Sequence, residues 1–410
     1  MREQVTRVTR QSWGSRLGTA IAGIGGGFLL VIAAIAGLGW NENRAVETSR
    51  SLSEGAGSVV ELDQSGTARD PAGAVLDTAG MLVHVSGNLA GPVPVDTQLG
   101  GPAVPVDTTR LTRVVEMYQW KEERRSETRN KVGGGTETVT RYTYSTEWSA
   151  QQIDSGRFAE PSGRENPPMP VRGGSFAVDR VLDVGDRRWT VPAAYVSRIG
   201  EERALSLSDS DGAAIAQIIG AGGPASVAQG VAYFGADPMR PEVGDVRISY
   251  SARTADNASV VASDGGDTLK PWTSSNGREI FLIREGNVAA AAMFEEEQQA
   301  NVVMTWGLRL AGFVAMFVGF RMMFGIVGVI GDVIPFVGSL ARFATGVVAF
   351  ALTMVLAPVT IGIAWLAVRP LLGAVIVAAG LAAAAGAWFI AGRRNGKKAA
   401  VEDTVPAATG

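Results

Sequence analysis

An uncharged apolar run near the N-terminus constrains this chain most. It covers Leu17–Trp40, about 24 residues, and at about 1.5 Å per helical residue it reaches about 36 Å. The hydrocarbon core of a bilayer is about 30 Å thick, so the run can span it. A basic leader and the small residues Ala34 and Ala36 also fit a cleaved signal peptide. The run is longer than a signal peptide's apolar region, and Trp40 suits a membrane interface, so we predict an uncleaved transmembrane helix at 17–40.

Three further apolar segments lie in the C-terminal part of the chain. We predict transmembrane helices at 301–323, 343–368 and 370–392, with an interfacial or re-entrant connection at 324–342. Arg369 and Pro370 stand between the last two segments, so the chain has to reverse there as a helical hairpin. The sequence therefore predicts four transmembrane helices, one N-terminal and three C-terminal.

Basic residues near the spans predict the orientation. Residues 1–16 carry four arginines, and the tail 393–410 begins with arginines and lysines. The positive-inside rule places both tails in the cytoplasm, which requires an even number of spans. Residues 41–300 are then extracytoplasmic.

The segment 41–300 is polar and long enough for its own core. Alternating β-branched and aromatic residues predict a hairpin of 112–125 with 136–148, and a Pro/Gly-rich loop at 160–174 could divide the segment. We predict a mixed α/β domain dominated by strands, ending in a helix at 288–299 that can continue into the second span. Five aromatic residues would share one face of the hairpin: Tyr118, Trp120, Tyr142, Tyr144 and Trp148. That face could bind an apolar or carbohydrate ligand, but we favour the core side of a sheet.

Composition excludes several kinds of active site. The 410 residues include no Cys and one His, so disulfides, thiolate metal sites and Cys nucleophiles are ruled out. His84 shares a strand face with Ser86, but no third member of a triad can be assigned. Asp209 and Asp211 lack the spacing of a calcium loop, and charges of both signs are interleaved throughout. We predict no catalytic residues, no metal, no cofactor and no nucleic-acid partner.

Small residues in the first span predict close helix contact. Gly23 and Gly27 lie four residues apart, a spacing that lets helices approach closely in lipid. A general richness in Ala and Gly explains the same pattern equally well.

A polar segment follows the first span at once, and Trp40 with the charges after it is typical of the outer collar of a membrane anchor. Arg44 is available there to a lipid phosphate or to Glu42, and the segment could also contact the start of the second span.

Several segments occur in one order along the chain: "TRQSWGSRLG", "WNENRAV", "SLSEGAG", "VEMYQWKE", "TRYTYSTEW", "PEVGDVRISYS", "MTWGLRLAGFVAMFVGF" and "AWLAVRPL". Together they resemble the LUMA family, also called the transmembrane protein 43 family, whose four-span members occur in the nuclear envelope, the endoplasmic reticulum and bacteria. The resemblance covers nearly the whole chain. It implies more than anchoring for the polar segment after the first span, and we predict that this segment is a junction between the membrane anchor and the large domain. The predicted junction and family-motif residues are Trp40, Asn41, Glu42, Arg44, Glu54, Gly55, Gly57, Trp306, Arg309, Arg369 and Pro370. The resemblance departs at Asn43, where the family has Gly, and at Arg321, where the family has an uncharged residue.

The resemblance implies a non-catalytic membrane scaffold that self-associates and organises membrane protein complexes or maintains envelope structure. Expected partners are membrane lipids, further copies of the chain and other membrane proteins. The alternative is a channel or lipid-handling transport protein that uses Arg309, Arg321, Asp332 and Arg369. A carboxylate-based extracytoplasmic hydrolase is the third hypothesis. Composition favours a bacterial inner membrane; a eukaryotic member would lie in the endoplasmic reticulum or inner nuclear membrane.

Overall fold

The computed structural model describes residues 4–220 and 225–368, together with residues 375 and 378. The chain divides into two compact units. Residues 1–9, 49–128 and 138–299 form the first, which we call the sheet unit. Residues 10–48, 129–137 and 300–410 form the second, which we call the helix unit.

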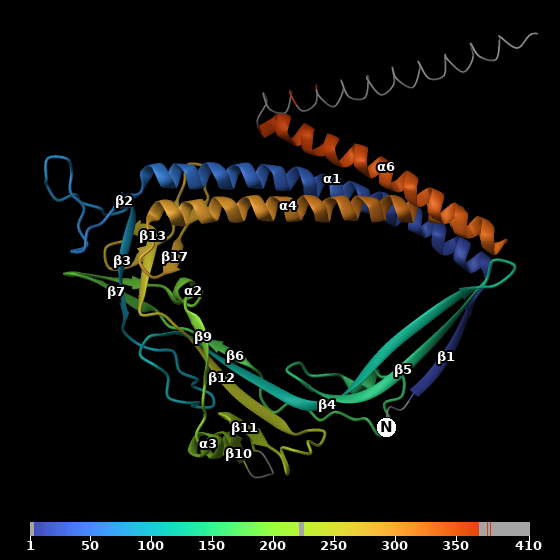
Figure 1. Cartoon of the computed structure of the whole chain (residues 1–410), viewed down its shortest axis with the longest axis horizontal. Coiled ribbons are helices and arrows are strands. Elements are labelled where there is room, and N and C mark those ends of the chain that lie inside the picture. The colour runs from blue at the N-terminus through green and yellow to red at the C-terminus, as the bar shows by residue number, and fades with distance from the viewer. Residues whose placement is uncertain (1–3, 221–224, 369–374, 376–377, 379–410) are drawn as a thin grey trace, which may run out of the picture. The chain divides into compact units, whose positions relative to one another are not determined.

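The first sheet of the sheet unit contains eight of the described strands (Figure 1). Their order is β1-β5-β4-β12-β11-β10, with β6 beside β4 and β9 beside β12. The bounds are β1 (Gln4–Gln11), β4 (Thr108–Asn130), β5 (Thr136–Ser149), β6 (Gly174–Phe176), β9 (Glu201–Leu205), β10 (Ala225–Ala228), β11 (Val231–Phe234) and β12 (Val246–Thr254). A short 3₁₀ helix, η1 (Ser155–Arg157), follows β5.

Strand β12 illustrates why this sheet forms. Its residues alternate between buried and partly exposed positions, with Val246, Ile248 and Tyr250 facing inward. β12 pairs antiparallel with β4, so that Ile248 lies opposite Val115. Helix α3 (Asp209–Ile219) packs Ile215 into the same core.

The second sheet has seven described strands in the order β14-β13-β3-β7-β8, with β17 beside β13 and β2 beside β3. The bounds are β2 (Val60–Glu61), β3 (Leu82–Ala90), β7 (Arg180–Val184), β8 (Arg187–Val191), β13 (Asn257–Asp264), β14 (Leu269–Lys270) and β17 (Leu282–Glu285). Val85 and Val260 face each other across β3 and β13, and Trp189 of β8 is completely buried in this core. A two-stranded ribbon, β15 (Trp272–Thr273) with β16 (Glu279–Ile280), and a short helix, α2 (Ala193–Val196), complete the unit.

Four helices carry the apolar sequence: α1 (Trp13–Ser58), α4 (Ala290–Met323), α5 (Gly325–Gly331) and α6 (Pro335–Val368). Among the described residues, three stretches are long and apolar enough to cross a membrane, Trp13–Ser58, Ala290–Gly331 and Val337–Leu366. The chain is therefore a membrane protein with one such helix before its strand-rich domain and two after it. The predicted span 370–392 and the tail 393–410 lie outside the described residues.

Three helices are longer than the apolar runs that predicted them. α6 begins at Pro335, within the predicted connection 324–342. α1 continues through Ser58 without a break, and its 46 residues reach about 69 Å, well beyond the thickness of a bilayer. α4 begins at Ala290 and runs through the second apolar stretch as one continuous helix, as predicted. α1 and α4 lie side by side and antiparallel, because Leu38 contacts Gly312 and Asn41 hydrogen-bonds to Thr305 (Figure 1).

The predicted hairpin is present as β4 and β5, but a further strand joins it. β1, whose residues were predicted to lie in the cytoplasmic N-terminal tail, is the edge strand next to β5. In the helix unit, Arg16 donates a hydrogen bond of 2.5 Å to the carbonyl oxygen of Gly134 in the turn of the hairpin.

Candidate functional site

A buried ion pair joins three helices of the helix unit. Glu42 of α1 is 1% exposed, and Arg309 of α4 donates to both of its carboxylate oxygens at 2.7 Å. The indole nitrogen of Trp365 in α6 donates to the same carboxylate at 2.5 Å. The arrangement is the two-pronged geometry in which Arg binds carboxylates most strongly. We call these three residues the Glu42 network.

Aromatic rings cover the positive side of this network. The Arg309 guanidinium lies 4.7 Å from the centre of the Trp306 ring and 5.8 Å from that of Trp365. Ring faces attract cations, and the attraction grows where water is excluded. Trp306 itself is 63% exposed and Trp40 of α1 is 61% exposed, as expected for Trp side chains at a membrane interface.

Polar side chains extend the contact between α1 and α4 by about one helical turn. Asn41 donates to the carbonyl oxygen of Thr305 at 3.2 Å, and Asn301 donates to that of Ala45 at 2.9 Å. Arg44 donates to Asn301 and to the Thr305 hydroxyl at 3.2 and 3.1 Å. Polar groups buried between helices need such partners, so the segment after the first span fixes α1 against α4.

The chemistry available to Glu42 is limited by its partners. Both oxygens accept hydrogen bonds from cationic or indole donors, and the carboxylate has almost no contact with solvent. A general base or an ion ligand needs an accessible lone pair in a cleft that its substrate can reach. The geometry therefore suits a structural role that holds α1, α4 and α6 together.

A second ionic cluster lies elsewhere in the helix unit, where α5 ends. Asp332 is fully buried and accepts hydrogen bonds from Arg16 of α1, at 2.6 Å, and from Arg342 of α6. Arg321 of α4 donates to the carbonyl oxygen of Arg342 at 2.6 Å. This cluster ties the N-terminal part of α1 to the connection between α4 and α6.

Glycines allow α1 and α4 to come into backbone contact. A Cβ atom on Gly27 would collide with the carbonyl oxygen of Gly319, and one on Gly319 would stand 2.8 Å from the carbonyl oxygen of Gly27. Gly23 has room, with Met322 oxygen 3.6 Å from the position of its Cβ. The small-residue spacing predicted to pack helices thus serves a contact within one chain at Gly27.

The C-terminal end of α1 is fixed within the sheet unit. Glu54 accepts three hydrogen bonds from the backbone and hydroxyl of Ser275, between 2.6 and 3.1 Å. A Cβ on Gly55 would stand 2.9 Å from the ring of Phe294, so only glycine allows that approach. Gly57 has open space around it. Glu54 and Gly55 therefore make contacts that depend on the residue type at these positions, whereas Gly57 does not.

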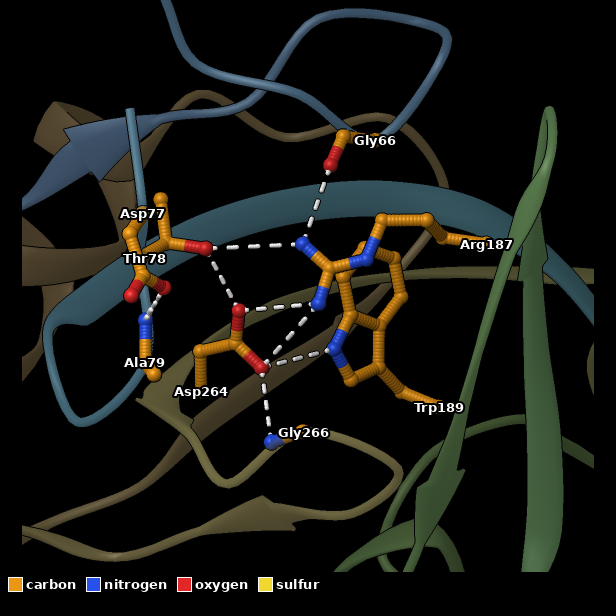
Figure 2. A network of polar contacts seen from close by, with 8 residues as sticks. All are labelled: Gly66, Asp77, Thr78, Ala79, Arg187, Trp189, Asp264 and Gly266. Atoms are coloured by element: carbon orange, nitrogen blue, oxygen red, sulfur yellow. Dashed lines mark hydrogen bonds and ion pairs between the residues drawn. The ribbon is translucent and has the colours of Figure 1, made fainter. Parts of the chain in front are cut away.

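The most connected carboxylate of the sheet unit is Asp264, at the end of β13 (Figure 2). It is 1% exposed and accepts from Thr78 at 2.6 Å, from the Trp189 indole at 3.0 Å and from Arg187 at 3.0 Å. The Arg187 guanidinium also lies 4.3 Å from the centre of the Trp189 ring. Burial raises the pKa of Asp264, but these hydrogen bonds outweigh burial and leave the pKa below its ordinary value.

Asp96 is a second buried carboxylate with several hydrogen-bond donors, beside the eight-stranded sheet. It accepts hydrogen bonds from Arg113 and, at 2.7 Å, from the hydroxyl of Tyr250. Burial raises the pKa of Asp96, but the hydrogen bonds from Tyr250, from the backbone and from Arg113 leave it lowered. Asp96 and Asp264 lie in different cores and have no partner in common, so they do not form an acid and base pair.

The predicted aromatic residues lie on one face of the hairpin but do not form an open surface. Tyr144 is 1% exposed and packs beside Phe158, with ring centres 5.9 Å apart. The rings of Tyr118 and Trp148 lie 5.3 Å apart, and the hydroxyl of Tyr118 accepts from Thr146. Tyr142 and Trp120 are partly buried. This arrangement resembles the partly covered face of a sheet more than a ligand-binding platform.

His84 and the acidic turn have structural partners. One imidazole nitrogen of His84 contacts Glu61 and the other lies 2.9 Å from the carbonyl oxygen of Val288, so neither offers a lone pair to Ser86. Asp211 forms a capping box with Ser208 at the start of α3, where its carboxylate accepts from the Ser208 backbone at 2.8 Å.

The family profile described as Transmembrane protein 43 matches residues 117–370 of this chain. The chain belongs to the transmembrane protein 43 family. It is 30% identical to Transmembrane protein 43 of Mus musculus over 348 residues, 82% of each chain, and 30% identical to that of Homo sapiens over 354 residues, 83% of each. It is 28% identical to the Transmembrane protein 43 homolog of Drosophila melanogaster over 371 residues, 88% of this chain and 93% of that one. No solved structure matches it significantly.

For this member of the transmembrane protein 43 family, the structure brings together Glu42 and Arg309, which are far apart in sequence. Arg369 and Pro370 lie outside the described residues. Sequence reasoning did not identify Trp365 or Arg342 as partners. A carboxylate beside an apolar span needs hydrogen-bond donors that compensate its charge. The sequence therefore indicates that Glu42 and Asp332 have such partners, but it does not show which residues they are.

Proposed function

We propose that this chain is a non-catalytic membrane scaffold that self-associates and organises other membrane proteins or maintains envelope structure. The observation that carries the proposal is the Glu42 network, in which the buried charges of Glu42 and Arg309 neutralise each other. A channel or a carrier needs charged groups that can exchange partners with a passing ion or ligand. A scaffold needs a rigid anchor, and a fully paired carboxylate between three helices supplies one.

Co-purification from native membranes tests the scaffold role. We expect the intact chain, extracted in mild detergent and analysed by mass spectrometry, to retain the same membrane proteins in repeated preparations. Arg309→Gln should retain fewer of them, because it loosens the anchor, whereas Glu295→Gln on the exposed face of α4 should retain all of them. An identical background from wild type, Arg309→Gln and an unrelated membrane protein would contradict the proposal.

The transport alternative makes a different prediction. It requires Arg309 and Asp332 to line a path, yet both are engaged in separate ion pairs. Vesicles reconstituted with the full chain should therefore show no ion or lipid flux above that of empty vesicles. Flux that disappears in Arg309→Gln would favour transport over the scaffold role.

The hydrolase alternative has little support from the buried carboxylates. Glu42, Asp96 and Asp264 each have their own set of hydrogen-bond donors and lie in separate clusters. General acid and base catalysis on a glycosidic bond would need two carboxylates facing one cleft. We therefore keep the proposal that the chain is not an enzyme.

The proposed orientation places the large domain outside the cytoplasm of a bacterial cell, on the basis of the positive-inside rule. It conflicts with one feature of the sheet unit, because β1 pairs with β5. A helix that crosses the membrane once would put Gln4–Gln11 and β5 on opposite sides. The orientation and this strand pairing therefore exclude each other, and labelling can decide between them.

A further inference from the structure

The helix unit contains a pocket of about 460 Å³ between α4 and α6. Its lining combines two arginines with apolar side chains: Arg321, Arg342, Phe343, Gly346, Val347 and Phe350. The pocket is separate from the Glu42 network, since Arg309 and Arg321 are twelve positions apart on α4, about 18 Å along the helix. It therefore lies toward the other end of the apolar stretch.

Two glycines make room for the arginines. A Cβ on Gly346 would stand 2.8 Å from a terminal nitrogen of Arg321, and one on Gly328 would stand 2.6 Å from Cγ of Arg342. The same nitrogen of Arg321 donates to the carbonyl oxygen of Arg342 at 2.6 Å. The guanidinium of Arg321 is thus held against α6 by backbone contacts, which orients it at the pocket.

The local charge is unbalanced. Arg16 and Arg342 share the single carboxylate of Asp332. Within residues 4–220 and 225–368, no carboxylate oxygen lies within 4.0 Å of the Arg321 guanidinium, so three positive charges face one negative charge. Uncompensated charge is costly beside an apolar span, and an anion at the pocket would remove most of that cost.

The rest of the pocket is apolar and open to the outside of the helix pair. Phe343 is 71% exposed, Val347 53% and Phe350 50%. They follow each other at helical spacing along α6, so they form a strip that leads away from the arginines. A ligand that fits both parts has an anionic head and an apolar chain.

We propose that this pocket binds the phosphate of an anionic glycerophospholipid between Arg321 and Arg342, with an acyl chain along Phe343, Val347 and Phe350. The inference is independent of the scaffold role. Arg binds phosphate through two parallel hydrogen bonds, which a Lys cannot reproduce. The net positive charge favours a headgroup with net negative charge over a zwitterionic one.

Native mass spectrometry of the intact chain in detergent tests the proposal with phosphatidylglycerol, phosphatidylcholine and inorganic phosphate as probes. We expect phosphatidylglycerol to bind about tenfold more tightly than phosphatidylcholine, and Arg321→Gln to weaken it about tenfold, as expected for one charge-assisted hydrogen bond. Arg321→Lys should keep part of the affinity. Gly346→Leu should weaken binding with both charges intact, and Arg240→Gln, an exposed arginine of the sheet unit, should change nothing.

The unfolding midpoint of each variant, followed by Trp fluorescence, shows whether it is folded. If Arg321→Gln does not fold, Arg321→Lys and Gly346→Leu carry the test. Equal affinity for phosphatidylglycerol in wild type, Arg321→Lys and Gly346→Leu would overturn the proposal. Displacement of the lipid by an equal concentration of inorganic phosphate would assign the pocket to free phosphate and would overturn the lipid as its ligand.

Discussion

Glu42 is one residue whose burial decides how the helices are held. Its carboxylate is 1% exposed and has three donor contacts from two helices other than its own. Breaking a buried ion pair by removing one partner costs about 3–5 kcal/mol, because the other charge is left without compensation. The stability of the helix unit therefore depends on Glu42 and Arg309 being present together, more than on either charge by itself.

We predict that Arg309→Gln lowers the free energy of unfolding by about 3–5 kcal/mol, because the buried carboxylate of Glu42 loses its cationic partner. Glu42→Gln should cost a similar amount. The double variant Glu42→Gln/Arg309→Gln should cost clearly less than the sum of the two, as measured by denaturant unfolding in detergent micelles. Additive losses would contradict the pairing, and Glu295→Gln serves as the control on an exposed face of α4.

Asp264 leads to a prediction about pH. Its pKa in the folded state lies below the ordinary value near 3.9, so the unfolded chain binds its proton first as pH falls. The stability that Asp264 contributes is complete above about pH 4 and is lost as pH falls through its folded pKa. We predict that the unfolding midpoint, read from Trp fluorescence, falls as the pH is lowered below about 4.

The variant Asp264→Asn should have a lower unfolding midpoint at pH 7, because its amide nitrogen would face the hydrogen-bond donors that now surround the carboxylate. Its unfolding midpoint should also depend less on pH. Asp77→Asn is the control, since Asp77 is exposed and accepts only from the Ala79 backbone among the contacts of Figure 2. A pH dependence in Asp264→Asn as steep as in wild type would contradict the assignment.

At the scale of elements, the antiparallel contact of α1 with α4 is the main long-range feature of the helix unit. Gly27 meets Gly319 at backbone distance, whereas Gly25 on the same helix has open space around it. We predict that Gly27→Leu destabilises the helix unit by at least about 1–3 kcal/mol, the usual cost of overpacking. Gly25→Leu should be neutral or slightly stabilising, because Leu favours helix over Gly. Equal unfolding midpoints for the two variants would contradict the contact.

Local patterns predicted some elements and not others. Uninterrupted apolar runs predicted the long helices, and alternation predicted β4 and β5, because each of these signals is contained in neighbouring residues. β1 was missed because Val5 and Val8 are separated by polar residues and its partner β5 lies more than a hundred positions away. The continuation of α1 to Ser58 was missed because the segment mixes strong helix formers such as Glu42 and Arg44 with serines and glycines, so neighbouring residues give no clear helix signal.

The candidate site was predicted only in part. Trp40, Glu42 and Arg309 stood out because charged and aromatic residues are unusual beside apolar spans. Their pairing depends on the tertiary contact of α1 with α4, and Trp365 depends on α6 as well. The two glycines beside Arg321 and Arg342 carry no local signal, since Gly is common throughout the span sequences.

At the scale of the whole molecule, the absence of Cys from the sequence makes orientation measurable. We predict that Met239→Cys and Val132→Cys, both highly exposed, react with an impermeant maleimide on intact bacteria. Thr6→Cys in β1 should react only after the membrane is permeabilised. Reaction of all three on intact cells would establish that β1 stays with β5 and would contradict the proposed orientation.

Self-association also belongs to the whole molecule. The contact at Gly27 is made within one chain, so the proposed self-association has to use other surfaces. Exposed apolar side chains along α6, such as Val355 at 66% and Ile363 at 59%, are available for that purpose or for contact with lipid. A scaffold role requires that part of the population exists as assemblies in its native membrane.

Subunit counting by single-molecule photobleaching tests that central claim most directly. The variant Met239→Cys carries one fluorophore per chain, because the sequence offers no other thiol, and it can be observed in vesicles taken from native membranes. If the chain is a self-associating scaffold, most fluorescent spots should bleach in two or more steps at low expression. Single-step bleaching throughout, equal to that of a known monomeric membrane protein labelled in the same way, would contradict self-association.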